Sequence, residues 1–273
     1  MESISCLICG ADKGRPIFDR ESPRHVICRR CGFVYENPRP SFAEMLAYYR
    51  SGYYESLPPA DPTARSERGE AICSWAGDRI GPDDLVVEIG CGHGAALNHV
   101  RRQFGCKAIG IEPSESQAAV ARATFGLDVI GGGFENADIG EGKAKLVFLF
   151  HVLEHLHDPI AAIRKCGRAL ADDGVLFIEV PNVLNPNRRK RLSAWFSLEH
   201  IWYFSPATLT AVAAMAGFSP LRIEATNAVR LLARNGGSPV TIPNEFGSVR
   251  RALWRHDAVY WPRKIMAKLL GRG

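Results

Sequence analysis

The sequence predicts an α/β fold: a doubly wound, mostly parallel sheet with a terminal antiparallel hairpin, a small N-terminal four-cysteine module and a basic C-terminal helical tail. Three observations predict it. From residue 85 onward, short apolar segments alternate with amphipathic ones, as in repeated βα units. Two Cys-x2-Cys pairs precede this region. Residues 248–273 hold seven Arg or Lys and one Asp, a net charge of +6, whereas the rest of the chain holds 27 basic and 28 acidic side chains.

The composition is that of a globular protein. Hydrophobic residues make up 46% of the 273 residues and charged residues 23%, which excludes wholesale disorder. No stretch approaches the roughly 18 to 20 consecutive apolar residues that span a bilayer. The opening MESISCLICG has no basic region followed by an apolar one. We therefore expect no secretory signal and a cytoplasmic location, to which the basic tail could add a peripheral membrane contact.

The first predicted element is a module over residues 1–40. Four of the eight cysteines form the pairs Cys6/Cys9 and Cys28/Cys31, which are separated by 18 residues. This is the spacing of two-knuckle zinc sites. Four thiolates favour tetrahedral Zn²⁺ and leave no open coordination position, so we expect a structural zinc ion in a zinc-ribbon-like module. Four free thiols and an iron–sulfur site are the alternatives.

A helical connector is expected next, over residues 41–80. An aromatic pattern over residues 42–56 predicts one or two helices, three prolines then break the chain, and a further helix is expected from about residue 63 to residue 79. Gly81 and Pro82 end this segment. The α/β domain is expected to follow, over residues 81–235.

Strands and helices alternate within this domain. Helices are expected to start at Ser114, Asp158 and Ser205, the last two of which precede a proline. Residues 221–234 form two strand-like runs separated by two residues, which predicts a hairpin. Repeated βα units imply a parallel sheet covered by helices on both faces. The predicted strands before the hairpin are LVVEI (85–89), KAIGIE (107–112), LDVI (127–130), KLVFLF (145–150) and VLFIEV (175–180).

The last segment, residues 236–273, is expected to be a linker followed by a basic amphipathic tail. Pro262 should divide residues 248–270 into two helices. Apolar and aromatic side chains interleaved with Arg and Lys suit a helix that lies on an anionic membrane surface. Packing of the same apolar stripe against the α/β domain is the alternative.

A glycine-rich loop follows the first strand of the domain, with Gly90, Gly92 and Gly94 at alternate positions. Glycine permits positive φ and lets a ligand contact the backbone at the carboxyl end of a parallel strand, where open α/β sheets bind ligands. Ala95 keeps a dinucleotide fingerprint open, because the third position of that motif can be alanine. Two carboxylates accompany the loop: Glu88 could reach a cationic ligand group, and Glu112 could accept both ribose hydroxyls of an adenosine cofactor.

Together with HVLEHLHDP (151–159), IEVPN (178–182) and EHIWYFSPATL (199–209), these motifs resemble class I S-adenosylmethionine-dependent methyltransferases. The resemblance covers residues 70–235 and implies a Rossmann-like methyltransferase sheet. It implies that the loop packs on the amino-acid part of the cofactor and that Glu112 binds its ribose. Lys145 departs from the pattern, in which Asp is common before this strand. The implied cofactor-binding residues are Glu88, Gly90, Gly92, Gly94, Glu112, Phe134, Glu135, Phe150 and His151.

Two groups of histidines and carboxylates could take part in chemistry. Residues 151–155 read H-V-L-E-H, an order that excludes the H-E-x-x-H metalloprotease motif, and Glu154 and His155 are expected to orient a loop. Glu199–His200 should lie above the carboxyl ends of the strands. A histidine is a natural base near neutral pH, so we assign proton removal to His200, oriented by Glu199. The same pair resembles the substrate-side loop of sugar C-methyltransferases; a purely structural role for His200 is the alternative.

The four-cysteine module followed by the methyltransferase-like domain resembles zinc-ribbon methyltransferases of sugar or polysaccharide modification. The resemblance implies methyl transfer from S-adenosylmethionine to a small-molecule acceptor: a sugar, nucleotide-sugar or glycan. A nucleic-acid methyltransferase is a weaker alternative, because no Asn/Asp-Pro-Pro-Tyr/Phe motif follows the strand at 145–150. An NAD(P)-dependent oxidoreductase and a non-catalytic cofactor-binding regulator are further alternatives. The acceptor atom and the oligomeric state are left open.

Overall fold

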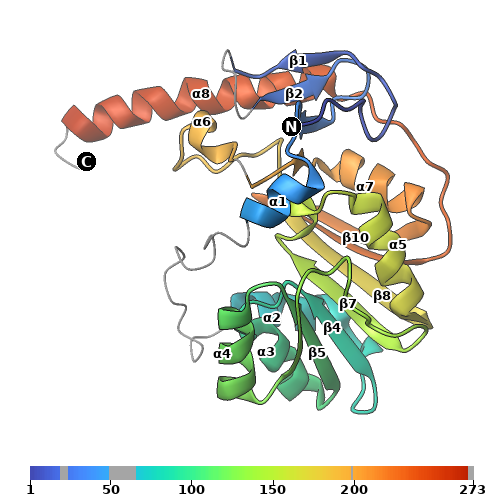
Figure 1. Ribbon diagram of the computed structural model, residues 1–273. Helices are drawn as coiled ribbons and strands as arrows, with labels where there is room; N and C mark the ends of the chain where they lie inside the picture. The colour runs from blue at the N-terminus through green and yellow to red at the C-terminus, as the bar shows by residue number, and fades with distance from the viewer. Residues whose placement is uncertain (19–23, 49–65, 198, 270–273) are drawn as a thin grey trace.

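The computed structural model describes residues 1–18, 24–48, 66–197 and 199–269 and contains two sheets (Figure 1). The larger sheet has seven strands in the order β10-β11-β8-β7-β4-β5-β6. Its five strands from β6 to β8 are parallel, and β11 and β10 add antiparallel strands beyond β8. The predicted mostly parallel sheet with a terminal hairpin is therefore confirmed. Its strands are β4 (Leu85–Ile89), β5 (Lys107–Glu112), β6 (Asp128–Gly131), β7 (Ala144–Phe150), β8 (Leu170–Pro181), β10 (Phe218–Ala225) and β11 (Ala228–Asn235).

Helices cover both faces of this sheet. Successive residues of a strand point to opposite faces, so Val86 and Val87 of β4 enter two different cores. On one face, α2 (Glu67–Ala76), α3 (Ala95–Phe104) and α4 (Glu115–Phe125) pack over Val86, Leu146 and Phe148. On the other face, α5 (Pro159–Ala169) and α7 (Pro206–Met215) contact each other over Val87 and its neighbours (Figure 1).

The predicted helix-start signals are present in the structure. The side chains of Ser114, Asp158 and Ser205 accept hydrogen bonds from backbone N–H groups of the first turns of α4, α5 and α7. A 3-10 helix (Gly77–Arg79) continues α2, and a second one, η4 (Leu153–His155), lies in the loop after β7. The predicted helix over 42–56 begins as α1 (Phe42–Tyr48), and its residues 49–56 lie outside the described residues, as do residues 63–65 of the next predicted helix.

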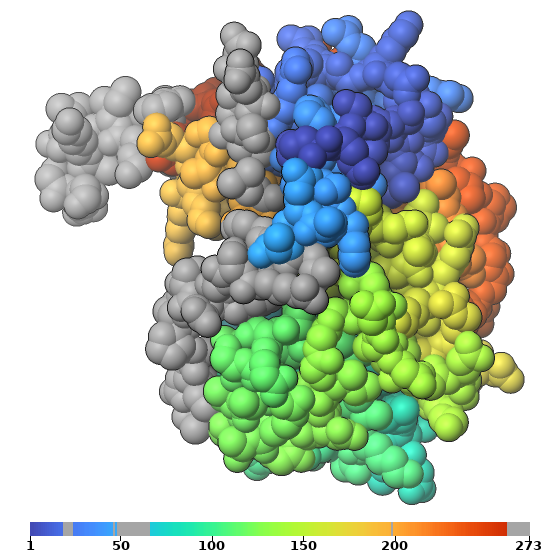
Figure 2. All heavy atoms as spheres, viewed as in Figure 1, coloured from blue at the N-terminus to red at the C-terminus, as the bar shows by residue number. Residues whose placement is uncertain are grey.

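The smaller sheet joins the N-terminal module to the main domain. Its order is β1 (Gly14–Pro16), β2 (His25–Cys28), β3 (Val34–Glu36) and β9 (Trp202–Tyr203). Phe33 stacks on Trp202 at 5.8 Å between ring centroids, so the two segments share one core. In Figure 2, the N-terminal residues (blue) sit directly on the main domain (green to yellow). The module is thus completed by a strand from more than 160 residues further along the chain.

The tail differs from the prediction. A single helix, α8 (Phe246–Leu269), runs through Pro262, and a short helix, α6 (Leu192–Trp195), contacts it (Figure 1). The predicted break at Pro262 is wrong, because one proline removes a single i→i−4 hydrogen bond and the neighbouring turns keep theirs. Val249 and Leu253 pack into a core with residues of β2, β3 and α6, so the first half of the tail is seated on the protein. Within the described ranges, no helix is both long enough and apolar enough to cross a bilayer.

Candidate active site

The glycine loop after β4 has a backbone conformation that favours glycine at three positions. Gly90, Gly92 and Gly94 all have positive φ, between 54° and 83°. A Cβ atom on Gly94 would lie 2.5 Å from the Cδ1 atom of Leu127, whereas a Cβ on Gly92 would meet no atom of the described residues within 4 Å. Gly94 is therefore required for close packing against Leu127 of the same protein. The Gly92 side of the loop is open, and there a bound molecule can contact the backbone.

Glu112, at the end of β5, holds this loop in place. Its carboxylate accepts hydrogen bonds from the backbone N–H of Gly92 at 2.7 Å and from that of Ser114 at 2.9 Å. The side chain is buried, and burial raises its pKa, although the two backbone N–H groups work in the opposite direction. Glu112 thus fixes the glycine loop against the start of α4.

Glu88 is a buried carboxylate beneath the same loop. It is 3% exposed, and its Oε2 atom has no hydrogen-bond partner among the described residues. Burial raises its pKa well above the ordinary value, and the positive charge of Arg68 only partly compensates. A buried carboxylate oxygen without a hydrogen-bond partner destabilises the folded state, and such groups in native proteins are often explained by a bound ligand or ion. Beside an open glycine loop, it suits a cationic group of a ligand such as the ammonium of an amino acid.

The other predicted cofactor residues lie on the loop after β6 and at the end of β7. Phe134 is buried, its ring lies 4.9 Å from the ammonium of Lys165, and Glu135 beside it is exposed. The Lys165 ammonium donates to the carbonyls of both residues and so fixes this loop. Phe150, at the end of β7, packs on Phe177 at 5.3 Å between centroids. It is therefore a core residue at the edge of the site.

His151 is held in a strained conformation by a charged network. It has a φ of 53°, unusual for a residue other than glycine. Its two ring nitrogens lie 3.2 Å from carboxylate oxygens of Glu154 and Glu179. Burial opposes protonation, but the two carboxylates outweigh it and raise the pKa of His151 to about 9. Sequence reasoning missed Glu179 and its partner Arg230; a carboxylate within the buried run VLFIEV was the available signal.

His200 lies in a compact cluster with Glu154 and His155. The ring centroids of His155 and His200 are 4.7 Å apart. One side-chain nitrogen or oxygen atom from each of the three residues lies within 4.8 Å of those of the other two. Burial lowers the pKa of His200 to about 4, an effect that the charge of Glu154 opposes, and its Nδ1 atom has no hydrogen-bond partner among the described residues. His200 is therefore neutral at physiological pH. Glu199 enters the cluster through its backbone carbonyl, 2.7 Å from Nδ1 of His155.

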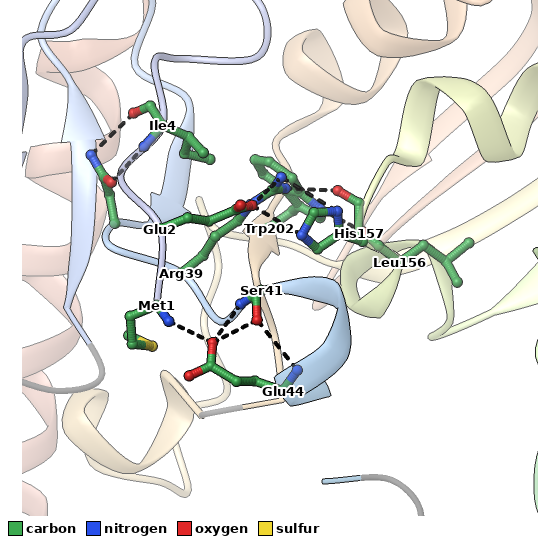
Figure 3. Close-up of polar contacts among 10 residues, drawn as sticks. Met1, Glu2, Ile4, Arg39, Ser41, Glu44, Leu156, His157 and Trp202 are labelled. Carbon is green, nitrogen blue, oxygen red and sulfur yellow. Dashed lines mark hydrogen bonds and ion pairs between the residues drawn. The ribbon is translucent and has the colours of Figure 1, made fainter. Parts of the chain in front are cut away.

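The N-terminal module is fastened to the loops that carry these histidines. Arg39 of the module donates to the carbonyl of His157 at 2.7 Å (Figure 3). Trp202 of β9, on which Phe33 of the module stacks, donates its indole N–H to the carbonyl of Leu156 at 2.8 Å. A ring nitrogen of His25 lies 3.4 Å from the carbonyl oxygen of His200. Since β3 also pairs with β9, two strands of the module border the His200 loop.

The four predicted metal ligands lie together at one end of the module. The Sγ atoms of Cys6 and Cys31 are 3.4 Å apart and those of Cys9 and Cys28 are 3.5 Å apart, with no disulfide between them. All four sulfur atoms lie within 4.8 Å of one another. A tetrahedral site with Zn–S bonds of about 2.3 Å needs sulfur atoms about 3.8 Å apart. The donor set and its spacing fit a closed tetrahedral metal site.

Known proteins resemble the chain over the same region. The profile of a methyltransferase-domain family matches residues 65–223. The C-methyltransferase NovU of Streptomyces niveus is 30% identical over 192 residues, which is 67% of this chain and 43% of NovU. A ubiquinone biosynthesis O-methyltransferase of Pseudomonas aeruginosa is 30% identical over 140 residues, 49% of this chain and 59% of the relative. The chain thus spans about half the length of these two relatives.

Solved structures share the fold at lower identity. Geranyl diphosphate methyltransferase in complex with S-adenosylmethionine superposes with a TM-score of 0.52 at 16% identity. The match covers 62% of this chain and 84% of that enzyme. At this identity, the likeness concerns the fold alone.

Proposed function

The chain belongs to the class I S-adenosylmethionine-dependent methyltransferase family, and from this premise we propose that it transfers a methyl group from S-adenosylmethionine to a small-molecule acceptor. The family profile covers more than half of the chain, including the whole parallel part of the sheet. The observation that carries the proposal is the loop after β4. Glu112 holds the loop at Gly92, and Glu88, at the end of the strand that leads into the loop, has a carboxylate oxygen with no hydrogen-bond partner among the described residues.

The residues of the loop fit the cofactor group by group. When bound, S-adenosylmethionine supplies a methyl group on a positively charged sulfur. Glu88 would accept the cofactor's ammonium, and Glu112 would accept its ribose hydroxyls. Phe134 and Glu135 would flank the adenine. Phe150 and His151 would border the cofactor at the end of β7, where the charged network fixes the ring of His151.

His200 is our proposed acceptor of the substrate's proton. The ring is neutral, so it carries a free lone pair at physiological pH. Burial makes it a weak base in the free protein, but Glu154 stabilises the protonated form electrostatically. The sequence pairs His200 with Glu199, whereas Glu154 has the larger electrostatic effect on it. We keep Glu199 as the residue that fixes the loop, through its carbonyl contact with His155.

The acceptor that we propose is a sugar, a nucleotide-sugar or a glycan end. The motifs from EHIWYFSPATL and the four-cysteine module carry this part of the proposal. One relative is named as a C-methyltransferase and another as an O-methyltransferase, so carbon and oxygen are both candidate acceptor atoms. A nucleic-acid substrate is disfavoured by the lack of a base-flipping motif after β7, and an NAD(P)-dependent reaction by the family assignment.

We also propose that Cys6, Cys9, Cys28 and Cys31 hold one structural Zn²⁺. Four thiolates fill a tetrahedral ion completely, so the metal would stabilise the small sheet and leave no position for a substrate. Through β3 and β9, that sheet supports the His200 loop.

Isothermal titration with S-adenosylhomocysteine, S-adenosylmethionine and NADH tests the proposed cofactor. We expect both sulfur compounds to bind and NADH not to bind. Glu112→Ala should weaken S-adenosylhomocysteine binding at least tenfold, because hydrogen bonds to a charged group contribute about 1.5–3 kcal/mol. Binding of NADH alone would overturn the proposal. Methyl transfer to sugars, nucleotide-sugars and short glycans would then identify the acceptor.

A further inference from the structure

A basic cleft lies between the loop after β8 and the helix α8, and none of its described lining residues belongs to the glycine loop. It has a volume of about 580 Å³. The loop contributes residues between Leu184 and Arg188, and α8 contributes residues between Ser248 and Val259. The loop begins directly after the carboxyl end of β8, which is the edge of the sheet that carries the candidate active site.

Positive charge gathers in this cleft, and the described residues that line it supply no negative side chain. Arg188, Arg251 and Arg255 line it, and none of its lining residues within the described ranges is Asp or Glu. Arg251 donates to the hydroxyl of Ser248 at 3.4 Å. The guanidinium groups of Arg188 and Arg255 form no hydrogen bond or ion pair with any residue that the structure describes. The three arginines are exposed and line one hollow, so an anion bound there would be attracted by all three guanidinium groups.

The two walls of the cleft are held in fixed positions. His256 is 4% exposed, and its Nε2 atom lies 3.2 Å from the carbonyl oxygen of Asn187, which ties the helix to the loop. Val249 and Leu253 anchor the same stretch of α8 in the core. The arginines therefore project from a supported frame. Such preorganisation lowers the cost of binding a ligand.

We propose that this cleft binds a phosphate-bearing ligand, with Arg188, Arg251 and Arg255 as the phosphate-binding residues. Guanidinium groups match phosphate oxygens in geometry and charge, and several of them around one hollow suit a phosphate or diphosphate group. Trp254, which lines the cleft and is 71% exposed, offers a flat surface for a planar group beside the phosphate. The ligand is either a nucleotide-linked small molecule or the headgroup of an anionic lipid, since both present the same chemistry.

Two probes distinguish these sources. Isothermal titration with uridine diphosphate tests a free diphosphate, and sedimentation with phosphatidylglycerol or phosphatidylcholine vesicles tests a lipid headgroup. The test variant is Arg251→Gln/Arg255→Gln, in the full chain. The matched control is Arg250→Gln, on the same helix, whose guanidinium lies 5.5 Å from the ring of Phe246 and does not line the cleft.

We expect at least one anionic probe to bind, the double variant to lose about tenfold or more in affinity, and the control to stay within about twofold of wild type. Loss of uridine diphosphate binding identifies a soluble ligand; loss of phosphatidylglycerol binding alone identifies a lipid. The proposal is overturned if neither probe binds, if phosphatidylcholine pellets the protein equally, or if the control loses as much as the double variant. S-adenosylhomocysteine titration of the same variants should be unchanged, which keeps this result separate from the proposed methyl transfer.

Discussion

Replacing Glu88 by Gln should stabilise the protein and weaken cofactor binding at the same time. Glutamine has the shape of glutamate but cannot ionise, so it removes the cost of a charge beneath the loop. Glu88 has a raised pKa because it is buried, and its Oε2 atom has no partner within the described part of the chain. Under the proposed function the same carboxylate accepts the cofactor's ammonium. Loss of this carboxylate should then reduce S-adenosylhomocysteine affinity tenfold or more, because a hydrogen bond to a charged group contributes about 1.5–3 kcal/mol of binding free energy.

The gain in stability should depend on pH in a defined direction. In the unfolded chain, Glu88 ionises near 4.5, whereas in the folded protein its pKa is higher. Between these two values the folded state holds more protons, so the stability of the wild type falls as the pH rises. One proton changes the free energy of unfolding by at most about 1.4 kcal/mol per pH unit. From about pH 5 to pH 7, Glu88→Gln should therefore gain up to about 3 kcal/mol on wild type, or roughly 6–12 °C in Tm.

Thermal unfolding at several pH values, with and without S-adenosylhomocysteine, measures both effects. The exposed Glu141, whose carboxylate lies 4.0 Å from Arg168, provides the control Glu141→Gln, which should shift neither Tm nor affinity. A Glu88→Gln variant that is less stable than wild type at pH 7, or whose advantage is the same at every pH, refutes the burial argument. A stabilised variant with unchanged affinity refutes only the role of Glu88 in binding the cofactor.

Three other predictions test the remaining parts of the site. Gly92→Ala should cost about 1–2 kcal/mol of stability because the φ of Gly92 is positive. The added methyl meets no atom of the described residues within 4 Å and should weaken S-adenosylhomocysteine binding; unchanged affinity would place the cofactor elsewhere. His200→Ala should lower kcat about 10²-fold and leave cofactor affinity unchanged. Because the pKa of His200 is about 4, the ring stays neutral between about pH 8 and pH 5, so its titration should not reduce wild-type activity in that range. A fall in wild-type activity over this range that is absent in His200→Ala would contradict the assignment. Cys28→Ser should abolish zinc binding, which elemental analysis measures. It should also lower kcat with unchanged cofactor affinity, because β3 pairs with β9 beside the His200 loop. Normal activity without zinc would show that the active site does not depend on the N-terminal module.

Local signals were sufficient to predict most of the main domain. The runs LVVEI and KAIGIE became β4 and β5 with the predicted bounds, because continuous apolar stretches of this length fit strands buried on both faces. Ser114 and Asp158 capped the helices that they were expected to cap, since a cap is a contact between residues close in sequence. The glycine loop and the cysteine pairs were equally readable, because their chemistry depends on short spacing.

The features that sequence reasoning missed depend on contacts between distant segments. Arg188 and Arg255 are 67 residues apart, and nothing in either local pattern indicates that they line one cleft. Likewise, Glu179 meets His151 only because β7 and β8 are neighbours in the sheet. The expected break at Pro262 is absent for a related reason. The low helix propensity of proline costs a limited amount of free energy, and the helix continues because its other hydrogen bonds outweigh that cost.

By itself, the sequence determined the alternation of strands and helices, the glycine loop with its two carboxylates and the four-cysteine group, because each is written in residues that lie close together along the chain. Only the tertiary structure decided that β9 completes the N-terminal sheet, that Glu154 and His155 enclose His200, and that α8 closes a basic cleft against the loop after β8. These features depend on packing between segments that are far apart along the chain and bury one another's surfaces. Their energy depends on which side chains meet in space, and that is set by the whole fold.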